Sequence, residues 1–252
     1  MRKSPIIKEV QARSILSKSG IPGADYCVNA YVGCSHACEY CYATFMKKYT
    51  GHTEAWGTFV DVKVNAAELL RKQIQKAKRG HVMVSSVTDA YQPIEVKYRL
   101  TRQCLEILLE HQFPVGILTK SPLVLRDLDI IKRFDEIEVG ITITTDDETM
   151  RKLFEPAAPP IEARIHTLRK LKEQGVRTYV FVGPMLPMDP EVLSEKIGKY
   201  ADSVLISRMN YVTRTAHLFK KLDMTQWLDK GFTEALKTRI RKSLGQEKVI
   251  DC

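Results

Sequence analysis

The sequence has no apolar run long enough to span a membrane, and its first ten residues, MRKSPIIKEV, lack the apolar core of a signal peptide. It also has no low-complexity linker and no repeat at a fixed period. These absences argue against a membrane-spanning protein, a secreted protein and a repeat array. We therefore expect a cytoplasmic, globular protein.

Cysteine is scarce, with six in 252 residues, and three of the six lie in one short segment. This usage fits a reducing compartment better than a disulfide framework. The other three are scattered along the chain and form no second cluster motif: Cys27, Cys104 and Cys252. We expect Cys104 to be a core residue of a helix, because it lies in the apolar pattern Leu-Thr-Arg-Gln-Cys-Leu-Glu-Ile-Leu-Leu.

The charge balance is basic, with a formal net charge of +9, whereas the hydrophobic content of 44% and the charged content of 27% are ordinary for a globular protein. The excess is uneven: between Tyr211 and Ile250 there are nine Lys or Arg and four Asp or Glu. This segment is either a solvated basic helix or a surface for a polyanion such as nucleic acid. The sequence leaves both interpretations open.

Short β-branched runs alternate with amphipathic segments along the chain. Six runs are strand candidates: Tyr26–Tyr31, Val82–Val87, Val115–Thr119, Ile137–Thr144, Thr178–Val182 and Ser203–Ile206. Strands separated by helices indicate parallel βαβ units, and near-continuous apolar strands indicate a sheet buried on both faces. Six units are fewer than the eight of a closed barrel, so we predict an α/β fold with a partial (β/α)6 TIM-type barrel.

The helices between the strands have clear boundaries in the sequence. We expect Asn65 to cap a helix that Gly80 ends, and Ser121-Pro122 to begin another. Pro159-Pro160 should lead into a helix that stops at Gly175, and Asp189-Pro190 should start a further one. We predict a single domain over residues 1–252. It comprises an N-terminal extension (1–25), a barrel core (about 26–207) and a basic helical C-terminal region (208–252).

The strongest chemical signal is the spacing C-x3-C-x2-C formed by Cys34, Cys38 and Cys41. Three thiolates within eight residues can surround one metal centre, and cysteine thiolates are the usual ligands of iron–sulfur clusters. Three ligands on a four-iron cubane would leave one iron open to bind another molecule. The alternative is a structural zinc site with His36 as the fourth ligand, but zinc ligands usually come as paired C-x2-C units, and no second pair exists.

Five ordered blocks, together with the six-unit array, make the chain resemble the radical S-adenosylmethionine (SAM) superfamily and, within it, the spore photoproduct lyase-like branch. The blocks are Asn29–Ala43 with the three cysteines, Trp56–Asn65, Thr88–Glu95, Leu118–Ser121, and Phe154–Pro156 followed by Arg164. Residues 85–89 lack the cysteine that the DNA-repair enzyme of this branch uses as a hydrogen donor. The resemblance therefore does not extend to that enzyme's hydrogen donor.

The resemblance implies that the three thiolates hold a [4Fe–4S] cluster whose fourth iron binds SAM. Reductive cleavage of SAM then gives a 5′-deoxyadenosyl radical, which abstracts hydrogen from a substrate. In this family Tyr40 would lie near the adenine, and Thr88 and Asp89 would receive the SAM ammonium group. Lys120 and Thr142 would hold the SAM carboxylate, whereas we expect Arg164 to pair with Glu155 instead.

We therefore predict a radical SAM enzyme, of lyase or transferase type, that acts on an unidentified substrate with an external one-electron reductant of the ferredoxin or flavodoxin type. Two alternatives remain open. One is a radical SAM enzyme directed at nucleic acid, steered by the basic C-terminal region. The other is a non-catalytic metal-binding or electron-transfer protein. The sequence does not identify which side chains are catalytic.

Overall fold

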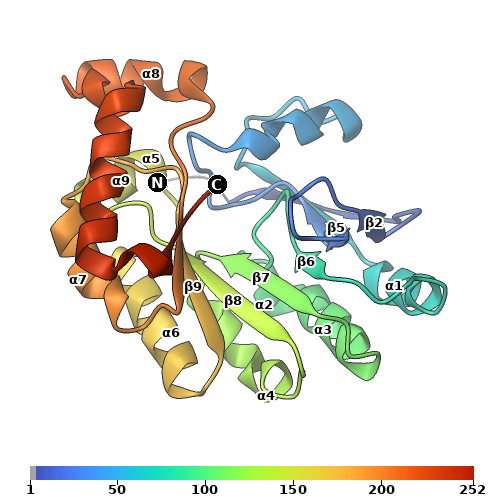
Figure 1. Cartoon of the computed structure of the whole chain (residues 1–252). Helices are drawn as coiled ribbons and strands as arrows, with labels where there is room; N and C mark the ends of the chain where they lie inside the picture. Colours follow the sequence, from blue (N-terminus) through green and yellow to red (C-terminus); the bar gives the residue numbers. More distant parts are fainter. Residues whose placement is uncertain (1–3) are drawn as a thin grey trace.

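The computed structural model describes residues 4–252, so the first three residues of the predicted N-terminal extension lie outside the described part. An eight-stranded sheet forms its centre, with the order β11-β10-β9-β8-β7-β6-β3-β2 (Figure 1). These strands are β2 (Leu16–Lys18), β3 (Tyr26–Val28), β6 (Val82–Val84), β7 (Val115–Thr119), β8 (Ile137–Thr142), β9 (Arg177–Val182), β10 (Ser203–Ile206) and β11 (Val249–Asp251). Every neighbouring pair is parallel except β2 with β3.

The six predicted strands are all present, as β3 and β6–β10, and the partial α/β barrel is confirmed. Three of them end earlier than predicted, because the chain turns into loops at Asn29, Ser85 and Ile143. Strand β11 was not predicted. It adds a further parallel strand beside β10 at one edge of the sheet.

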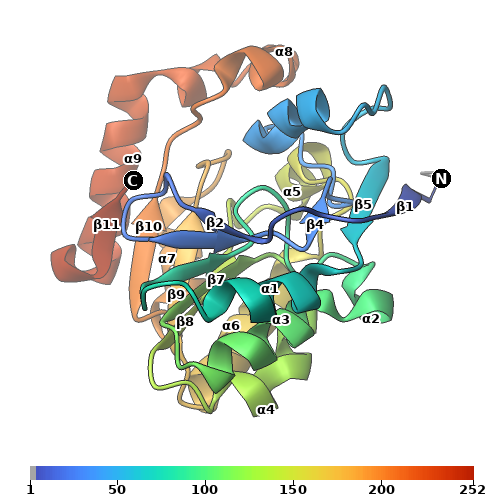
Figure 2. The same cartoon turned by 90° about the vertical axis from the view of Figure 1, so that its right-hand side faces the viewer.

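Helices cover the outer face of the sheet (Figures 1 and 2). The helices between the strands are α1 (Ala66–Ile74), α2 (Glu95–Tyr98), α3 (Leu100–Glu110), η2 (Pro122–Asp127), α4 (Leu128–Ile131), α5 (Glu148–Phe154), α6 (Ile161–Glu173) and α7 (Pro190–Gly198). Cys104 is fully buried in α3, as predicted.

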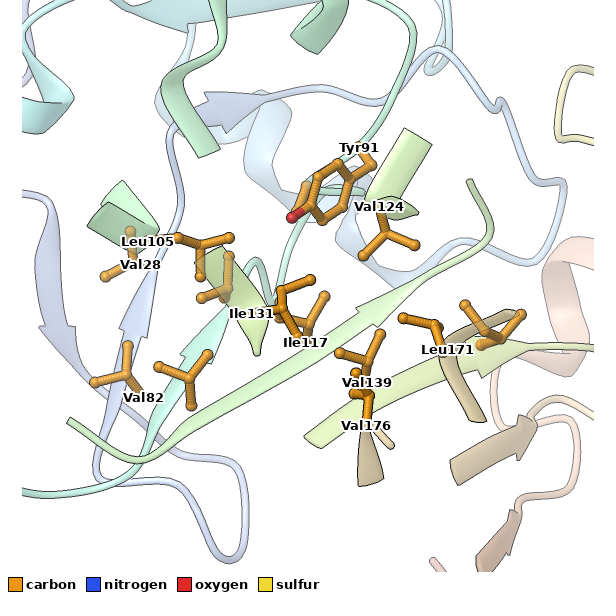
Figure 3. Close-up of a cluster of buried hydrophobic side chains, with 14 of the residues drawn as sticks. Val28, Val82, Tyr91, Leu105, Ile117, Val124, Ile131, Val139, Leu171 and Val176 are labelled. Carbon is orange, nitrogen blue, oxygen red and sulfur yellow. The ribbon is translucent and has the colours of Figure 1, made fainter. Parts of the chain in front are cut away.

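The core lies between the strands and these helices (Figure 3). Ile117 of β7 and Val139 of β8 belong to one buried cluster with Leu105 of α3, Ile131 of α4 and Leu171 of α6. Burying a side chain of this size stabilises the fold by about 1.5–3 kcal/mol. The next residues along each strand point to the opposite face because side chains alternate along a strand. The inner face of the sheet therefore carries a different set of side chains from the core.

Most of the predicted helix boundaries hold. Helix α6 begins after Pro160 and stops before Gly175, whose φ of +76° suits a glycine. At the start of α7, Asp189 accepts hydrogen bonds from the N–H groups of Glu191 and Val192. Helix α1 begins directly after Asn65, as predicted, but it stops at Ile74 rather than near Gly80, and the Asn65 side chain makes no capping hydrogen bond within the described residues. Asn65 instead exchanges two hydrogen bonds of 2.9 Å with the backbone of Ala12, which fastens the N-terminal segment to the barrel.

A second, three-stranded sheet lies beside the barrel and was not predicted. Strand β5 (Phe59–Lys63) lies in its middle, parallel to β1 (Ile6–Val10) and antiparallel to β4 (Tyr31–Val32). Because β4 leads directly into the cysteine segment, this sheet fixes one end of that segment.

The C-terminal region contains α8 (Val212–Lys221), η3 (Thr225–Leu228), α9 (Lys230–Leu244) and η4 (Gln246–Lys248) before β11. Helix α9 packs against α7, where Arg239 forms an ion pair with Glu191. Within residues 4–252, no helix combines the length and the apolar character that a membrane crossing needs.

Candidate functional site

The cysteine loop, residues 33–41, lies between β4 and the 3₁₀ helix η1 (Tyr42–Tyr49). Cys34 and Cys38 are buried, and Cys41 is half-buried. The loop begins at Gly33, whose φ is +86° and where a Cβ would lie 2.4 Å from the Phe59 carbonyl oxygen. Only glycine satisfies both conditions, so the loop depends on this residue for its path away from β4.

Residues that follow β6 hold the first half of the cysteine loop. The Gly33 carbonyl oxygen accepts from Thr88 Oγ1 at 2.7 Å and from Gln92 Nε2 at 3.0 Å. The Ser35 backbone N–H donates to Gln92 Oε1 at 3.0 Å. These bonds place the loop at the C-terminal ends of the parallel strands, where α/β barrels carry their active sites.

The segment after α5 holds the second half of the loop. The Glu39 N–H donates to the Phe154 carbonyl oxygen at 2.9 Å, and the Ala157 N–H donates to the His36 carbonyl oxygen at 3.2 Å. Between these two bonds, the Tyr40 hydroxyl donates to the carboxylate of Glu155. The cysteine loop is thus bound to residues more than 100 positions away in the sequence.

Glu155 is a fully buried carboxylate with several partners. Its Oε2 lies 2.5 Å from Arg164 Nη2, which confirms the predicted pairing, and its Oε1 accepts from Thr144 Oγ1 at 3.1 Å. Lys120 Nζ lies 3.8 Å from Oε1. Burial raises the pKa of Glu155, but the charges of Arg164 and Lys120 outweigh burial and lower the pKa to about 2. Glu155 is therefore ionised at neutral pH.

This pKa shift predicts how stability depends on pH. A glutamate in the unfolded chain has a pKa of about 4.3, so the stabilisation from Glu155 is fully present above that value. It should be lost as the pH falls toward the folded value of about 2. The loss should reach about 3 kcal/mol. The measurement is urea unfolding of the wild type and of Glu155→Gln at several pH values; equal pH dependence in the two proteins would contradict the assignment.

The predicted residues Thr88 and Asp89 make their hydrogen bonds within the protein. Asp89 is buried and accepts from Thr119 Oγ1 at 2.6 Å, from the Lys120 N–H at 2.9 Å and from the Tyr91 N–H at 2.9 Å. Asp89 Oδ2 also lies 3.3 Å from His36 Nδ1, a contact that the sequence did not reveal. Burial opposes ionisation of Asp89, but His36 and these donors outweigh burial and hold its pKa well below the usual range.

The predicted residues Lys120 and Thr142 lie beside each other at the strand ends. Strand β7 pairs with β8 so that Thr119 faces Ile141, and continuing this register places Lys120 opposite Thr142. Lys120 Nζ lies 5.6 Å from the centre of the Tyr40 ring. Burial lowers the pKa of Lys120, but Cys38 and Glu155 raise it above its ordinary value, so the ammonium stays charged. The structure thus brings Lys120 together with Tyr40 and Glu155, while Thr142 lies at the end of the neighbouring strand β8.

The proximity of Trp56 to Cys41 of the cysteine loop was not predicted from the sequence. The buried indole Nε1 of Trp56 has no hydrogen-bond partner among residues 4–252. Burial raises the pKa of the Cys41 thiol; the backbone N–H of Ala43 opposes this effect most, followed by the Lys120 charge and the Trp56 indole. Trp56 belongs to the block 56–65 that carries the family resemblance, and that block was the sequence feature that could have indicated a role for Trp56 at the site. Within residues 4–252, no three His, Cys, Asp or Glu side chains converge as ligands of one metal ion would.

The comparison with family models decides the family. Residues 28–195 match the model of the radical SAM superfamily, and this span includes the cysteine loop and strands β6–β9. The chain belongs to the radical SAM superfamily.

Two relatives show how far the similarity extends along this radical SAM chain. It is 43% identical over 185 residues to the Methanocaldococcus jannaschii "Uncharacterized protein MJ0683", covering 73% of this chain and 69% of that protein. It is 26% identical over 156 residues to the "Radical SAM Nalpha-GlyT isomerase" of Pseudomonas phage M6, covering 61% of this chain and 32% of that protein. The chain also spans 61% of the length of the Mycobacterium tuberculosis relatives, such as Rv2578c.

Solved structures share the fold of this radical SAM protein. Spore photoproduct lyase in complex with dinucleoside spore photoproduct superimposes with a TM-score of 0.69 at 14% identity, covering 97% of this chain and 81% of that one. Streptococcus suis SuiB bound to S-adenosylmethionine gives a TM-score of 0.61 at 12% identity, covering 99% of this chain and 50% of that one. The superfamily and the fold predicted from the sequence are both confirmed.

Proposed function

We propose that this chain is a radical SAM enzyme in which Cys34, Cys38 and Cys41 hold a [4Fe–4S] cluster. The observation that carries the proposal is one buried loop with three thiols, fastened at both halves to the C-terminal ends of the barrel strands. When bound, the cluster supplies the electron that cleaves SAM to methionine and a 5′-deoxyadenosyl radical, which abstracts hydrogen from the substrate. An external ferredoxin- or flavodoxin-type reductant would provide that electron.

The residues of the loop suit a cluster. Burial raises the pKa of the Cys38 thiol to about 12, an increase that the Lys120 ammonium opposes, so the thiol needs a metal to become a thiolate at neutral pH. The unpartnered Trp56 N–H is a donor available to the sulfur of Cys41. A zinc site with His36 has less support, because zinc ligands usually come as paired C-x2-C units and the sequence has no second pair.

The wall opposite the cluster loop supports a place for SAM. We assign Lys120 and Thr142 to the SAM carboxylate, because they supply a charged ammonium and a hydroxyl at the C-terminal ends of two neighbouring strands. The role of Tyr40 near the adenine stays a prediction, as does that of Thr88 and Asp89 toward the ammonium group. The internal bonds of Asp89 support a further role: they hold the backbone of Lys120 and so orient the wall.

Anaerobic reconstitution with iron and sulfide tests the proposal. We expect about four irons per chain, a brown protein, and 5′-deoxyadenosine when SAM and dithionite are added. Two results would count against it in different ways. A protein that retains zinc and never cleaves SAM would support the structural metal site. A protein that forms the cluster but releases no 5′-deoxyadenosine would support electron transfer alone.

A further inference from the structure

Four exposed aromatic rings form a continuous row, here called the aromatic row: Tyr211, Tyr42, Phe45 and Tyr49. The first two stack with ring centres 6.1 Å apart and an interplanar angle of 18°. Phe45 stacks on Tyr42 at 6.4 Å, and Tyr49 meets Phe45 edge-on at 6.5 Å. Their exposed fractions are 50, 42, 44 and 76% along the row. In the described part of the chain, every exposed Phe, Tyr or Trp side chain belongs to this row.

Two rings of the aromatic row, Tyr42 and Tyr211, connect the segments that follow β6 and β10, next to the cysteine loop. Tyr42 directly follows Cys41, and its hydroxyl donates to the Ser86 carbonyl oxygen just beyond β6. Tyr211 comes from the other side, between β10 and α8. Arg214 of α8 donates to Thr44 Oγ1 of η1 at 2.8 Å, which holds the two sides together. In both views, α8 and the light-blue η1 segment stand on the same side of the sheet (Figures 1 and 2).

The two segments that carry the row have positively charged side chains and no acidic ones. Residues 42–49 and 208–221, which carry the row, contain six Lys or Arg and no Asp or Glu. Lys48 and Arg208 are exposed, as are Lys220 and Lys221. Such a surface attracts a polyanion, and exposed aromatic faces offer stacking sites that need no particular base.

A single strand fits this surface better than a duplex or a membrane. In a duplex the bases stack on one another, so only its backbone could reach the surface and the rings would find no partner. A membrane presents a broad surface and cannot enter the mouth toward the buried thiols. A flexible single strand can contact the cations through its phosphates. At the same time, one of its unstacked bases can lie on a ring next to Cys41.

We propose that the aromatic row is a stacking platform for single-stranded nucleic acid and that it presents a nucleotide to the cysteine loop. The identity of the nucleotide as the substrate rests on the proposed function, whereas the binding itself does not. The substrate class that follows is a single-stranded nucleic acid with an unstacked base.

The test is fluorescence anisotropy of the purified full chain with labelled 20-nucleotide single strands of DNA and RNA of mixed sequence, and with the matching duplex. We expect the single strands to bind more tightly than the duplex. Phe45→Ala and Tyr211→Ala should each weaken binding about 5- to 150-fold. Val96→Ala, which removes an exposed apolar side chain on α2, is the control and should not weaken it.

A pair of charge variants gives a second measurement that does not depend on the rings. The double variant Lys47→Gln/Lys48→Gln should lower the salt slope of binding by about 0.7 per lost contact. Lys76→Gln/Lys78→Gln removes two exposed charges between α1 and β6, at the opposite end of the barrel, and should leave the slope unchanged. Circular dichroism of each variant checks that it folds.

Three results would overturn the proposal: no binding at low ionic strength, equal losses in both lysine pairs, or binding only to anionic phosphatidylserine vesicles or to peptides. Formation of 5′-deoxyadenosine by the reconstituted wild type is measured separately. Strand binding without 5′-deoxyadenosine would support the platform while contradicting the proposed function. Formation of 5′-deoxyadenosine without strand binding would support the proposed function and contradict the platform.

Discussion

Replacing Arg164 with methionine should lower the free energy of unfolding by about 3–5 kcal/mol. Arg164 is fully buried, and its guanidinium lies 2.5 Å from the equally buried carboxylate of Glu155. Methionine fills much of the same volume but leaves Glu155 with the more distant Lys120 as its remaining cationic partner, at 3.8 Å. A buried charge that loses its closest partner strongly destabilises the folded state. The decrease in the free energy of unfolding should therefore exceed that caused by breaking any surface ion pair. Urea unfolding monitored by circular dichroism measures it.

The same variant should also loosen the cysteine loop. Glu155 accepts a hydrogen bond from the Tyr40 hydroxyl. The nearby residues Phe154 and Ala157 form backbone hydrogen bonds with Glu39 and His36, respectively. Disturbing Glu155 therefore acts on the segment that contains Cys38. We expect iron incorporation to fall along with stability.

Arg169→Met is the matched control, because it lies on the same helix but pairs with Glu173 at the surface, at 3.7 Å. That pair should contribute less than about 1 kcal/mol. The double variant Glu155→Gln/Arg164→Met removes both charges and should be more stable than Arg164→Met alone. Equal losses in Arg164→Met and Arg169→Met would show that the buried pair is not what holds this region.

The barrel could be predicted because its signals are local. Runs such as Val115–Thr119 are apolar enough for a sheet covered on both sides, and Asp189-Pro190 starts a helix through its own side chain. The second sheet has no such signal. Strand β1 pairs with β5 across about 50 residues of chain, and β5 pairs backwards with the two-residue β4. Neither pairing follows from the pattern of one segment alone.

The capping hydrogen bond predicted for Asn65 is absent for the same reason, a pairing between distant segments. The position of Asn65 before an apolar helix is typical of an N-cap, yet its amide side chain pairs with the backbone of Ala12, 53 residues earlier. A tertiary partner thus replaced the local one. The helix forms anyway, because Leu70 and Ile74 bury its apolar face.

The site divides in the same way. The cysteine spacing identifies its chemistry, and the pairing of Arg164 with Glu155 could be anticipated because both lie in or next to one sequence block. The bond between Tyr40 and Glu155 spans 115 residues, and the Gln92 contacts with Gly33 and Ser35 span 59 and 57. These contacts depend on how the barrel closes. They explain why the loop is rigid enough to present three thiols, which spacing alone does not.

Cys38→Ala should lower 5′-deoxyadenosine formation by more than about 100-fold in protein reconstituted in parallel with the wild type. Cys38 is the buried central thiol of the loop and lies close enough to Lys120 for that ammonium to lower its pKa. Removing a cluster ligand costs more than removing a residue that only supports a ligand, which is worth 10- to 100-fold in metal affinity. The readouts are bound iron, visible absorbance and product measured by chromatography.

Cys104→Ala is the control that separates loss of a ligand from loss of a thiol. Cys104 is also buried, but it lies in the core of α3 among Leu105 and Leu108, so its replacement leaves only a small cavity. It should reduce stability by about 1 kcal/mol and leave the iron content and the product unchanged. If Cys38→Ala retained full iron and full product while Cys104→Ala lost them, the three-cysteine loop would not be the cluster site. Both variants remove one buried sulfur, but only Cys38→Ala removes it from the cysteine loop. If only Cys38→Ala loses iron and product, the Cys38 thiol is therefore a cluster ligand.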